Sequence, residues 1–422
     1  MQKDKNISNL KIKRTTILNG INSVGRLLKK AGMGPFRLDA DIIIERAKKR
    51  AGYDGPLPGQ TETGLRKVIA SILDEGQPNA FGLMATKTLF ERTLYGRLKV
   101  EQVLAANPQI EQTEIREPVF IIGMPRTGTT ILHALMHEDP QHRSPLAWEC
   151  LLPYPVPKPE TFTDNEQLRT VAKDFDQLFK LVPDFQRKHY MAADSPQECL
   201  SINALDFNSF QTPVQFYLPS YLKWFNHEAD KLATMRFHKR FLQYLQSGGV
   251  TAERWLLKTP VHMMRLEELF TVYPDAKIIM THRHPSKVVP SIASLLYSVR
   301  SLYSDSEDPV RTGHEQTELW GTYFERFLET RKKLDKEDRI IDIVFDDFVE
   351  DQMKTVRKIY DRFGWKLSAE AVNRFEHFLR QNPKDKNGAH YYTLEDFGLN
   401  DEFIARRFER FIDFFEQLKK TV

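Results

Sequence analysis

From residue 118 onward, short apolar runs alternate with longer stretches whose apolar residues have the spacing of amphipathic helices. The runs are PVFIIG (118–123), RWLLK (254–258), AKIIMTH (276–282) and RIIDIVF (339–345). Short strands separated by helices are typical of a parallel sheet with helices on both faces. We therefore predict an α/β fold with a central parallel β-sheet flanked by helices. Ligands of such sheets bind at the carboxyl ends of the strands, so the residues after each run are the first candidates for a site.

Helical patterns dominate the parts of the chain that lack such runs. Residues 1–115 are predicted to form a helical N-terminal region, and residues 116–422 the α/β domain. Residues 150–250 form a long helical insertion between the first two predicted strands, which we expect to cap the ligand site. Its aromatic residues either line an apolar acceptor pocket or fill the core: Phe207, Phe210, Phe216, Tyr217, Tyr221, Trp224 and Phe225.

The first predicted strand leads directly into GMPRTGTT (123–130), which has the frame of a phosphate-binding loop. Its two glycines allow a tight backbone turn, and the helix that begins near Gly128 directs free N–H groups toward an anion. A nucleotide-hydrolysing loop has lysine after the second glycine, where this chain has Thr129. Arg126, inside the loop, supplies a planar cation instead. The sequence therefore predicts a P-loop-like fold that holds a different phosphate-like ligand.

Further cations follow the next two predicted strands. Lys258 ends one run, and Arg283 follows another, with Ser291 further along the same predicted helix. Nucleoside triphosphatases hold magnesium with an aspartate at a strand end. Here only the last run is followed by aspartates, Asp346 and Asp347. We therefore expect a ligand with more than one phosphate-like group, bound and used without a metal.

Composition narrows the class of protein. The chain has 422 residues, 41% of them hydrophobic and 28% charged, with a net charge of +4, which favours a local anion pocket over a nucleic-acid surface. The two cysteines are too few for a disulfide framework or a cysteine zinc site, and a reducing cytoplasm is expected. We find no predicted membrane span or signal peptide.

The role of the N-terminal region stays open at this stage. Its stretch ISNLKIKRTTILNGINSVGRLLKKAGMG (7–34) is basic and partly amphipathic. It either packs as an N-terminal helix or lies on an anionic membrane as a peripheral contact. The whole region either completes the acceptor pocket or mediates a homodimer.

The motifs resemble those of the sulfotransferases, in particular a bacterial-type branch of that family. PRTGTT (125–130) looks like their 5′-phosphosulfate loop, and LLKTP (256–260) like their strand-end lysine stretch. Arg283 with Ser291 is similar to their 3′-phosphate site. Two later segments also resemble the family, FDDFVEDQMKTVRKIYDRFGW (345–365) and NPKDKNGAHYYTLEDFGL (382–399).

The resemblance implies transfer of a sulfuryl group from 3′-phosphoadenosine 5′-phosphosulfate to a hydroxyl or amine of a small-molecule or lipid-like acceptor. It implies that the phosphosulfate is held by Pro125, Arg126, Thr127, Gly128, Thr129 and Thr130. Arg283 and Ser291 would hold the 3′-phosphate, and Lys386 and Gly388 would close on it from the C-terminal loop. Lys258 would neutralise charge at the bridging oxygen.

The chain also departs from the family pattern. Arg126 stands where many members have lysine, Ile131 where many have tryptophan near the adenine, and Phe345 where they have tyrosine. The cytosolic branch places its catalytic histidine where this chain has Pro260. The adenine contacts and the general base are therefore not carried over.

We consider several candidates for the base that takes the proton of the acceptor. Glu149 and His262 come first, since the family has a glutamate near the former and the latter lies shortly after Lys258. His133, on the helix after the loop, comes next, and the C-terminal His390 and Tyr391 could also reach the pocket. Each histidine has an alternative interpretation as a hydrogen-bonded packing residue. Glu149 has an alternative interpretation as the partner in a structural ion pair.

Two other functions compete with a sulfotransferase. One is a phosphate-loop kinase or nucleotide hydrolase with an unusual loop, against which the missing lysine argues. The other is a non-catalytic protein that binds 3′-phosphoadenosine 5′-phosphosulfate or 3′-phosphoadenosine 5′-phosphate. Turnover of an acceptor, and dependence on ATP and magnesium, distinguish the three.

Overall fold

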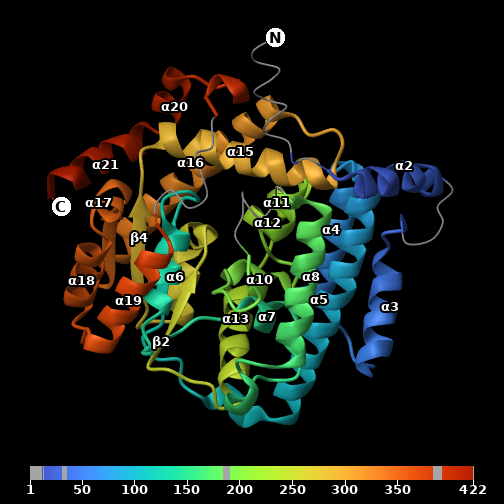
Figure 1. Cartoon of the computed structure of the whole chain (residues 1–422), viewed down its shortest axis with the longest axis horizontal. Helices are drawn as coiled ribbons and strands as arrows, with labels where there is room; N and C mark the ends of the chain where they lie inside the picture. The colour runs from blue at the N-terminus through green and yellow to red at the C-terminus, as the bar shows by residue number, and fades with distance from the viewer. Residues whose placement is uncertain (1–11, 13, 31–35, 184–190, 384–391, 422) are drawn as a thin grey trace.

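The computed structural model describes residues 12, 14–30, 36–183, 191–383 and 392–421. Within these ranges the α/β class is confirmed: a parallel sheet of five strands lies among helices, in the order β2-β3-β1-β4-β5 (Figure 1). The strands are β1 (Val119–Gly123), β2 (His142–Arg143), β3 (Arg254–Lys258), β4 (Lys277–His282) and β5 (Ile340–Val344).

Four of these strands coincide with the predicted apolar runs, and β2, with only two residues, carries no comparable signal. β1 is buried along its whole length because it is central and covered on both faces, which explains its continuous apolar sequence. In the register of the sheet, Ile121 of β1 lies beside Lys258, and Gly123 lies beside Thr281. The carboxyl ends of β3, β1 and β4 therefore meet at one edge, as the parallel topology requires.

Helices from the α/β domain cover the sheet. One core cluster joins the sheet to α6 (Thr129–His137), α18 (Gln352–Phe363) and α19 (Ala369–Gln381). The long helices α15 (Pro285–Tyr303) and α16 (Pro309–Leu334) run across one end of the molecule (Figure 1). The remaining helices of this part are α14 (Leu266–Val272), α17 (Phe345–Glu350), α20 (Asp401–Arg407) and α21 (Glu409–Thr421).

The described residues of the N-terminal region are mainly helical and pack beside the insertion. Its helices are α2 (Thr16–Lys30), α3 (Ala40–Ala51), α4 (Thr61–Asp74) and α5 (Ala80–Ala106). The insertion contributes α7 (Ala147–Leu151), α8 (Glu166–Leu181), α10 (Cys199–Ala204), α11 (Gln211–Gln215), α12 (Pro219–His227) and α13 (Lys231–Gln246). One continuous apolar core joins α3, α4 and α5 to the insertion and to the sheet.

The aromatic residues of the insertion belong mainly to this core. Phe216 and Phe225 are almost fully buried, and Tyr221 donates its hydroxyl hydrogen bond to the carbonyl of Phe207 at 2.8 Å. The core interpretation of this cluster therefore describes them better than an open acceptor pocket.

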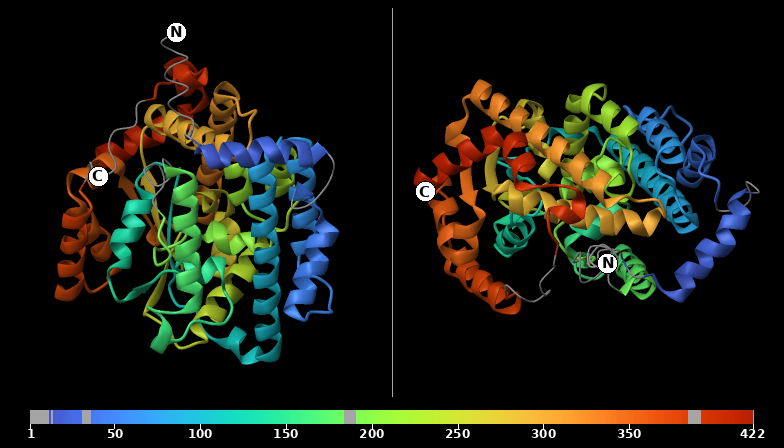
Figure 2. Two further views of the ribbon diagram at one scale, coloured as in Figure 1. Left: turned by 45° about the vertical axis from the view of Figure 1, so that its right-hand side comes forward. Right: turned by 90° about the horizontal axis from the view of Figure 1, so that it is seen from above.

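Helix α2 lies at the periphery, across the end of α5 (Figure 2). It exposes Ile17 and Val24, two of the large apolar residues with the most solvent contact. In the described residues, no helix is both long and apolar enough to cross a membrane.

Candidate active site

The loop between β1 and α6 adopts a backbone that its glycines permit. Gly123 has φ 139° and Gly128 has φ 89°, both in the region that favours glycine. A Cβ atom on Gly123 would lie 2.6 Å from the carbonyl oxygen of Thr281, and one on Gly128 would lie 2.9 Å from the ring of Phe345. The glycines therefore let the loop approach β4 and α17 closely, and α6 begins directly after it.

Thr127 fastens this loop to the sheet. Its hydroxyl donates to the carbonyl of Met124 at 2.6 Å and lies 2.6 Å from the hydroxyl of Thr281 on β4. The side chain is almost fully buried. Thr127 therefore shapes the loop through its side chain, while Thr129 and Thr130 open the first turn of α6.

The loop with Arg126 and the segment with Arg283 and Ser291 are far apart in the sequence and lie together in the structure. Arg126, at φ 69°, donates from Nε to Oγ of the buried Ser291 at 3.1 Å. Arg283 donates from Nη1 to the carbonyl oxygen of Arg126 at 3.3 Å, and its guanidinium lies 4.3 Å from the ring centroid of Phe345. Burial lowers the pKa of Arg283, which Tyr392 and Asp346 counteract.

Among the described residues, neither Arg126 nor Arg283 forms an ion pair with a carboxylate. Two guanidinium groups thus converge on one loop, and neither is in direct contact with a carboxylate of the described residues. Such an arrangement favours a polyanionic ligand, because the mutual repulsion of the cations is relieved when an anion binds between them.

Lys258 completes the cationic side of the site from the end of β3. It is buried, and its Nζ donates to Oγ1 of Thr130 at 3.3 Å. It also forms an ion pair with Glu198, whose side chain is 26% exposed. The second oxygen of Glu198 accepts a long hydrogen bond from Thr259 at 3.5 Å.

Residues 118–369 match the family model described as the sulfotransferase family. This chain belongs to the sulfotransferase family. Its activity is the transfer of a sulfuryl group, and the kinase or nucleotide-hydrolase alternative is not favoured. The fold is the P-loop-like fold of that family.

Curated relatives and solved structures agree with this assignment. The chain is 24% identical over 331 residues to omega-hydroxy-beta-dihydromenaquinone-9 sulfotransferase Stf3 of Mycobacterium bovis, which covers 76% of this chain and 79% of the relative. It is similar in structure to sulfotransferase STF1 from Mycobacterium tuberculosis H37Rv, with a TM-score of 0.78, 28% identity, and coverage of 89% and 99%. For sulfotransferase STF9 from Mycobacterium avium the TM-score is 0.81, with 28% identity and coverage of 89% and 96%.

Glu198 is the residue of this sulfotransferase site that the sequence analysis missed. It lies in the insertion, directly before α10, and not after a strand. Nothing in its local sequence distinguishes it from other glutamates of the chain. Only the packing of α10 against the end of β3 brings its carboxylate to Lys258.

Glu149, the carboxylate that the sequence favoured as a base, is held elsewhere. It is fully buried, accepts a hydrogen bond from Nη2 of Arg143 at 2.7 Å, and accepts another from the backbone N–H of Leu146 at 2.9 Å. Burial raises its pKa, and Arg143 counteracts this. These described partners hold the start of α7, and neither belongs to the loop between β1 and α6. A structural ion pair therefore fits the position of Glu149 better than a catalytic role.

The two candidate histidines are also enclosed. Nε2 of His133 lies 3.1 Å from Oγ of Ser144 and 3.3 Å from the carbonyl oxygen of Leu256, and burial holds the pKa of His133 well below its usual value. His262 is fully buried beside Phe120, and burial likewise keeps its pKa well below the usual value. Within the described part of the chain, neither ring has a hydrogen bond to the loop between β1 and α6.

The contacts predicted for the C-terminal loop involve Lys386, Gly388, His390 and Tyr391. These four residues lie outside the described residues. The roles given to Pro125 and to Thr129 rest on their places in the loop, before Arg126 and at the start of α6.

Proposed function

We propose that this sulfotransferase uses 3′-phosphoadenosine 5′-phosphosulfate as its donor and a lipid-like alcohol as its acceptor. The observation that carries the donor assignment is the convergence of Arg126, Arg283 and Ser291 at one end of the sheet. The donor has two separated anionic groups, a 5′-phosphosulfate and a 3′-phosphate. The site offers two matching features, the loop before α6 and the Arg283–Ser291 pair.

The loop fits the phosphosulfate on steric and electrostatic grounds. At Gly123 and Gly128 the loop backbone lies too close to Thr281 and Phe345 for a side chain. The start of α6 has no side-chain cap, so its N–H groups can face an anion. Pro125, Arg126, Thr129 and Thr130 would surround this group. Among the described residues, the strand ends that form the site carry cations instead of the aspartate that typically holds magnesium, which favours a reaction without a metal.

Lys258 is the residue that we assign to the developing charge. In sulfuryl transfer, as in phosphoryl transfer, negative charge builds on the oxygen of the leaving group. The buried ammonium lies beside Thr130, so it would face that position if the loop holds the phosphosulfate. A preorganised cation there is worth about 10² to 10³ in rate.

Glu198 is our candidate for the general base. Its carboxylate is partly exposed and pairs with Lys258, so it lies next to the cation that would neutralise the leaving oxygen. When Lys258 turns to the donor, Glu198 is free to accept the proton of the acceptor hydroxyl. Glu149 and His262 stay outside this arrangement.

A group of half-buried apolar side chains supports a lipid-like acceptor. One small core cluster is contacted by half-buried apolar side chains from several segments. They are Met84 of α5, Leu178 and Phe179 of α8, Met191 between α8 and α10, and Leu295 of α15. Leu295 follows Ser291 by one turn of α15, which brings this apolar surface close to the donor pair. The curated relative named above acts on omega-hydroxy-beta-dihydromenaquinone-9, a lipid-like molecule.

Two further proposals concern the surroundings of the site. The exposed Ile17 and Val24 of α2 would contact the membrane from which a lipid-like acceptor comes, as a peripheral contact of an otherwise cytoplasmic enzyme. A homodimer through the N-terminal region is the alternative use of that face. Cosedimentation with anionic vesicles and light scattering distinguish the two.

A series of primary alcohols of increasing chain length tests the acceptor. We expect KM to fall by up to ~4-fold for each methylene that the apolar surface buries. Phe179→Ala should raise KM for the long alcohols and leave the shortest one unchanged. Leu73→Ala, at an exposed position of α4, is the matched control. A KM that does not depend on chain length would contradict the lipid-like acceptor.

A further inference from the structure

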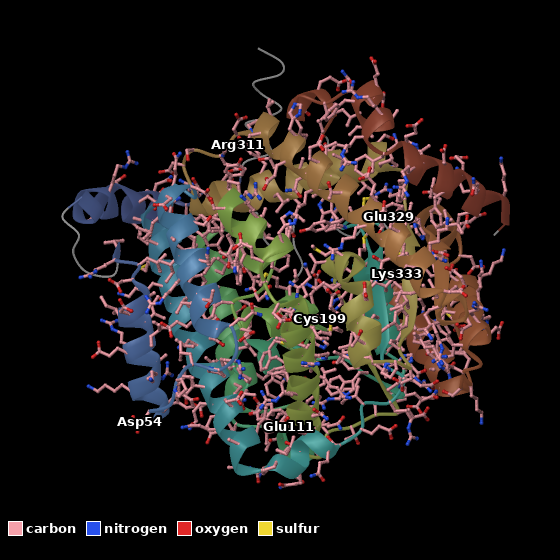
Figure 3. The ribbon with its side chains drawn as sticks, turned by 180° about the vertical axis from the view of Figure 1, so that it is seen from behind. Asp54, Glu111, Cys199, Arg311, Glu329 and Lys333 are labelled. Carbon is pink, nitrogen blue, oxygen red and sulfur yellow. The ribbon has the colours of Figure 1, made fainter. Side chains whose placement is uncertain are left out.

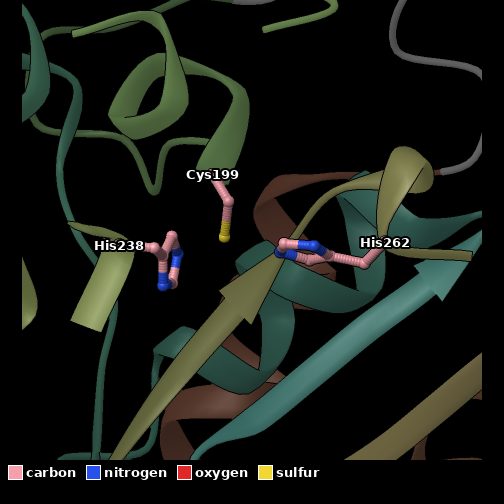
Figure 4. Close-up of side chains that lie close together, drawn as sticks. All are labelled: Cys199, His238 and His262. Carbon is pink, nitrogen blue, oxygen red and sulfur yellow. The ribbon is translucent and has the colours of Figure 1, made fainter. Parts of the chain in front are cut away.

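Three side chains that can bind a metal lie together behind the active site. Cys199 at the start of α10, His238 of α13 and His262 after β3 each direct one donor atom toward the others, and these atoms all lie within 4.8 Å of one another (Figure 4). The group lies in the interior of the molecule, where Figure 3 labels Cys199. His238 and His262 are fully buried, and Cys199 is almost so.

Three of the four ring nitrogens in this cluster are buried without a hydrogen-bond partner among the described residues. Nε2 of His238 and both ring nitrogens of His262 have no hydrogen-bond partner among the residues that the structure describes. Buried polar atoms without partners are rare, and each costs about 1–3 kcal/mol. A ligand that accepts their lone pairs would remove this penalty.

The orientation of His238 suits metal binding. Its Nδ1 lies 2.8 Å from the hydroxyl of Tyr273. If Nδ1 carries the proton and donates it to that hydroxyl, Nε2 keeps its lone pair for a cation. Metal-bound histidines are typically held by such an outer hydrogen bond. The two imidazole rings are nearly perpendicular, with centroids 5.9 Å apart.

We propose that Cys199, His238 and His262 form a binding site for a thiophilic transition-metal ion, Zn²⁺ or copper. One thiolate and two imidazoles are the donors that both ions favour. Metal–nitrogen and metal–sulfur bonds of about 2.0 and 2.3 Å place the donor atoms of a tetrahedral or trigonal site ~3.3–3.7 Å apart. The donor atoms, which lie within 4.8 Å of one another, would therefore close by up to about 1 Å around the ion.

Binding of the metal ion releases one proton, from the thiol of Cys199. Burial raises the pKa of the Cys199 thiol to about 12, so the thiol is protonated before the metal arrives. The metal–sulfur bond forms as the S–H bond breaks, and the proton leaves to solvent. The imidazoles bind as neutral groups, which burial already favours, since it lowers the pKa of His238 to about 3.

The position of the cluster gives the metal a structural role at the active site. Cys199 directly follows Glu198, and His262 lies in the turn after Lys258 and Thr259. An ion held by both would fix the start of α10 against the end of β3. It would thereby position the Glu198 carboxylate without touching substrate, a consequence that rests on the proposed function.

Metal content of the full-length protein tests the proposal. Cells are grown with added zinc or with added copper, the protein is dialysed against a weak chelator, and bound metal is measured by mass spectrometry. We expect about one ion per chain, and the metal found decides between zinc and copper. Cys199→Ser should retain at least ~10-fold less metal. Cys150→Ser, at the other buried free cysteine, should retain the parent amount.

A spectroscopic experiment does not depend on Cys199→Ser and covers the case in which that variant fails to fold. Protein refolded with Co²⁺ should show an intense near-ultraviolet absorption from a thiolate–cobalt bond. His262→Gln should weaken that band, with folding checked by circular dichroism. If the parent neither retains metal above the Cys199→Ser background nor shows the cobalt band, the proposal is overturned and the cluster is only packing or a buried-water site.

Kinetics separates the metal site from the proposed function. If metal removal lowers kcat and leaves KM for the donor unchanged, the ion acts through the position of Glu198. If the metal is bound but its removal leaves kcat unchanged, the binding site stands and its positioning role is wrong. If the protein binds metal and transfers no sulfuryl group at all, the proposed donor or acceptor has failed, and the metal site has not.

Discussion

The two sides of the active site differ in how they are built. On the donor side, Arg126, Lys258 and Arg283 lie at the carboxyl end of a strand of the central sheet or within three residues after it. On the insertion side, Glu198 and Cys199 lie at the start of the short helix α10, whose position depends on packing against α13 and the end of β3. Parallel strand ends thus assemble a site through the topology of the sheet, whereas an inserted segment does so only through its tertiary contacts.

The largest effect is expected at Glu198, on the insertion side of the site. Glu198→Gln keeps the shape of the side chain and removes its basicity, so we expect kcat to fall by ~10² to 10⁴ with donor affinity unchanged. Initial rates at saturating donor and acceptor measure this. Asp194→Asn, at an exposed position shortly before it, is the control and should match the parent. A kcat for Glu198→Gln within about threefold of the parent would remove it from the reaction.

The other glutamate should behave in the opposite way. Glu149→Gln leaves Arg143 buried without its counter-charge, which costs about 3–5 kcal/mol of the free energy of unfolding. We expect a large shift of the urea midpoint and an unchanged kcat per folded molecule. Glu160→Gln, at an exposed site, should leave stability unchanged. Loss of kcat in Glu149→Gln without loss of stability would return Glu149 to the list of bases.

On the donor side, Arg283→Ala should weaken binding of 3′-phosphoadenosine 5′-phosphate by ~10- to 100-fold, since a charged hydrogen bond contributes about 1.5–3 kcal/mol. Calorimetric titration measures the affinity. Lys287→Ala, an exposed cation in the first turns of the same helix, controls for a general loss of positive charge. Affinity within about twofold of the parent would show that the 3′-phosphate binds elsewhere.

The smallest effect concerns the packing of β2 and α6. Burial lowers the pKa of His142 to about 4 and holds that of His133 well below its usual value. In the unfolded chain these histidines bind protons near pH 6.5, so the unfolded state holds more protons between about pH 4 and 6.5. The free energy of unfolding should therefore fall as the pH drops through this window and level off above it.

Urea titrations across this pH range measure that slope, which is at most about 1.4 kcal/mol per pH unit for each histidine. His142→Gln should reduce the slope, whereas His227→Gln, at an exposed position, should not. An equal slope in the parent and in His142→Gln would mean that this residue does not stay neutral in the fold.

The sheet and the cationic cluster could be predicted from the sequence because their signals are local. Strands β1, β3, β4 and β5 are short apolar runs, and Arg126, Lys258 and Arg283 lie at or shortly after the ends of three of them. Strand β2 was not predicted because two residues cannot form a hydrophobic pattern. Glu198 was not predicted because its position beside Lys258 depends on where α10 packs. Glu149 was predicted as a general base because the sequence shows its carboxylate but not its ion pair with Arg143.

The cysteine count shows the same limit. Two distant cysteines argue against a cysteine zinc site, and this remains true of cysteines alone. The fold adds His238 and His262 from two other segments to Cys199. No spacing rule in the sequence links these three residues, so only the tertiary structure reveals the cluster.

The most direct test of the central claim is calorimetric titration of the purified protein with 3′-phosphoadenosine 5′-phosphate in the absence of magnesium, with ADP and ATP as controls. We predict tight binding that requires the 3′-phosphate and is lost in Arg283→Ala. Preference for ATP, or binding only when magnesium is added, would contradict the donor site described above.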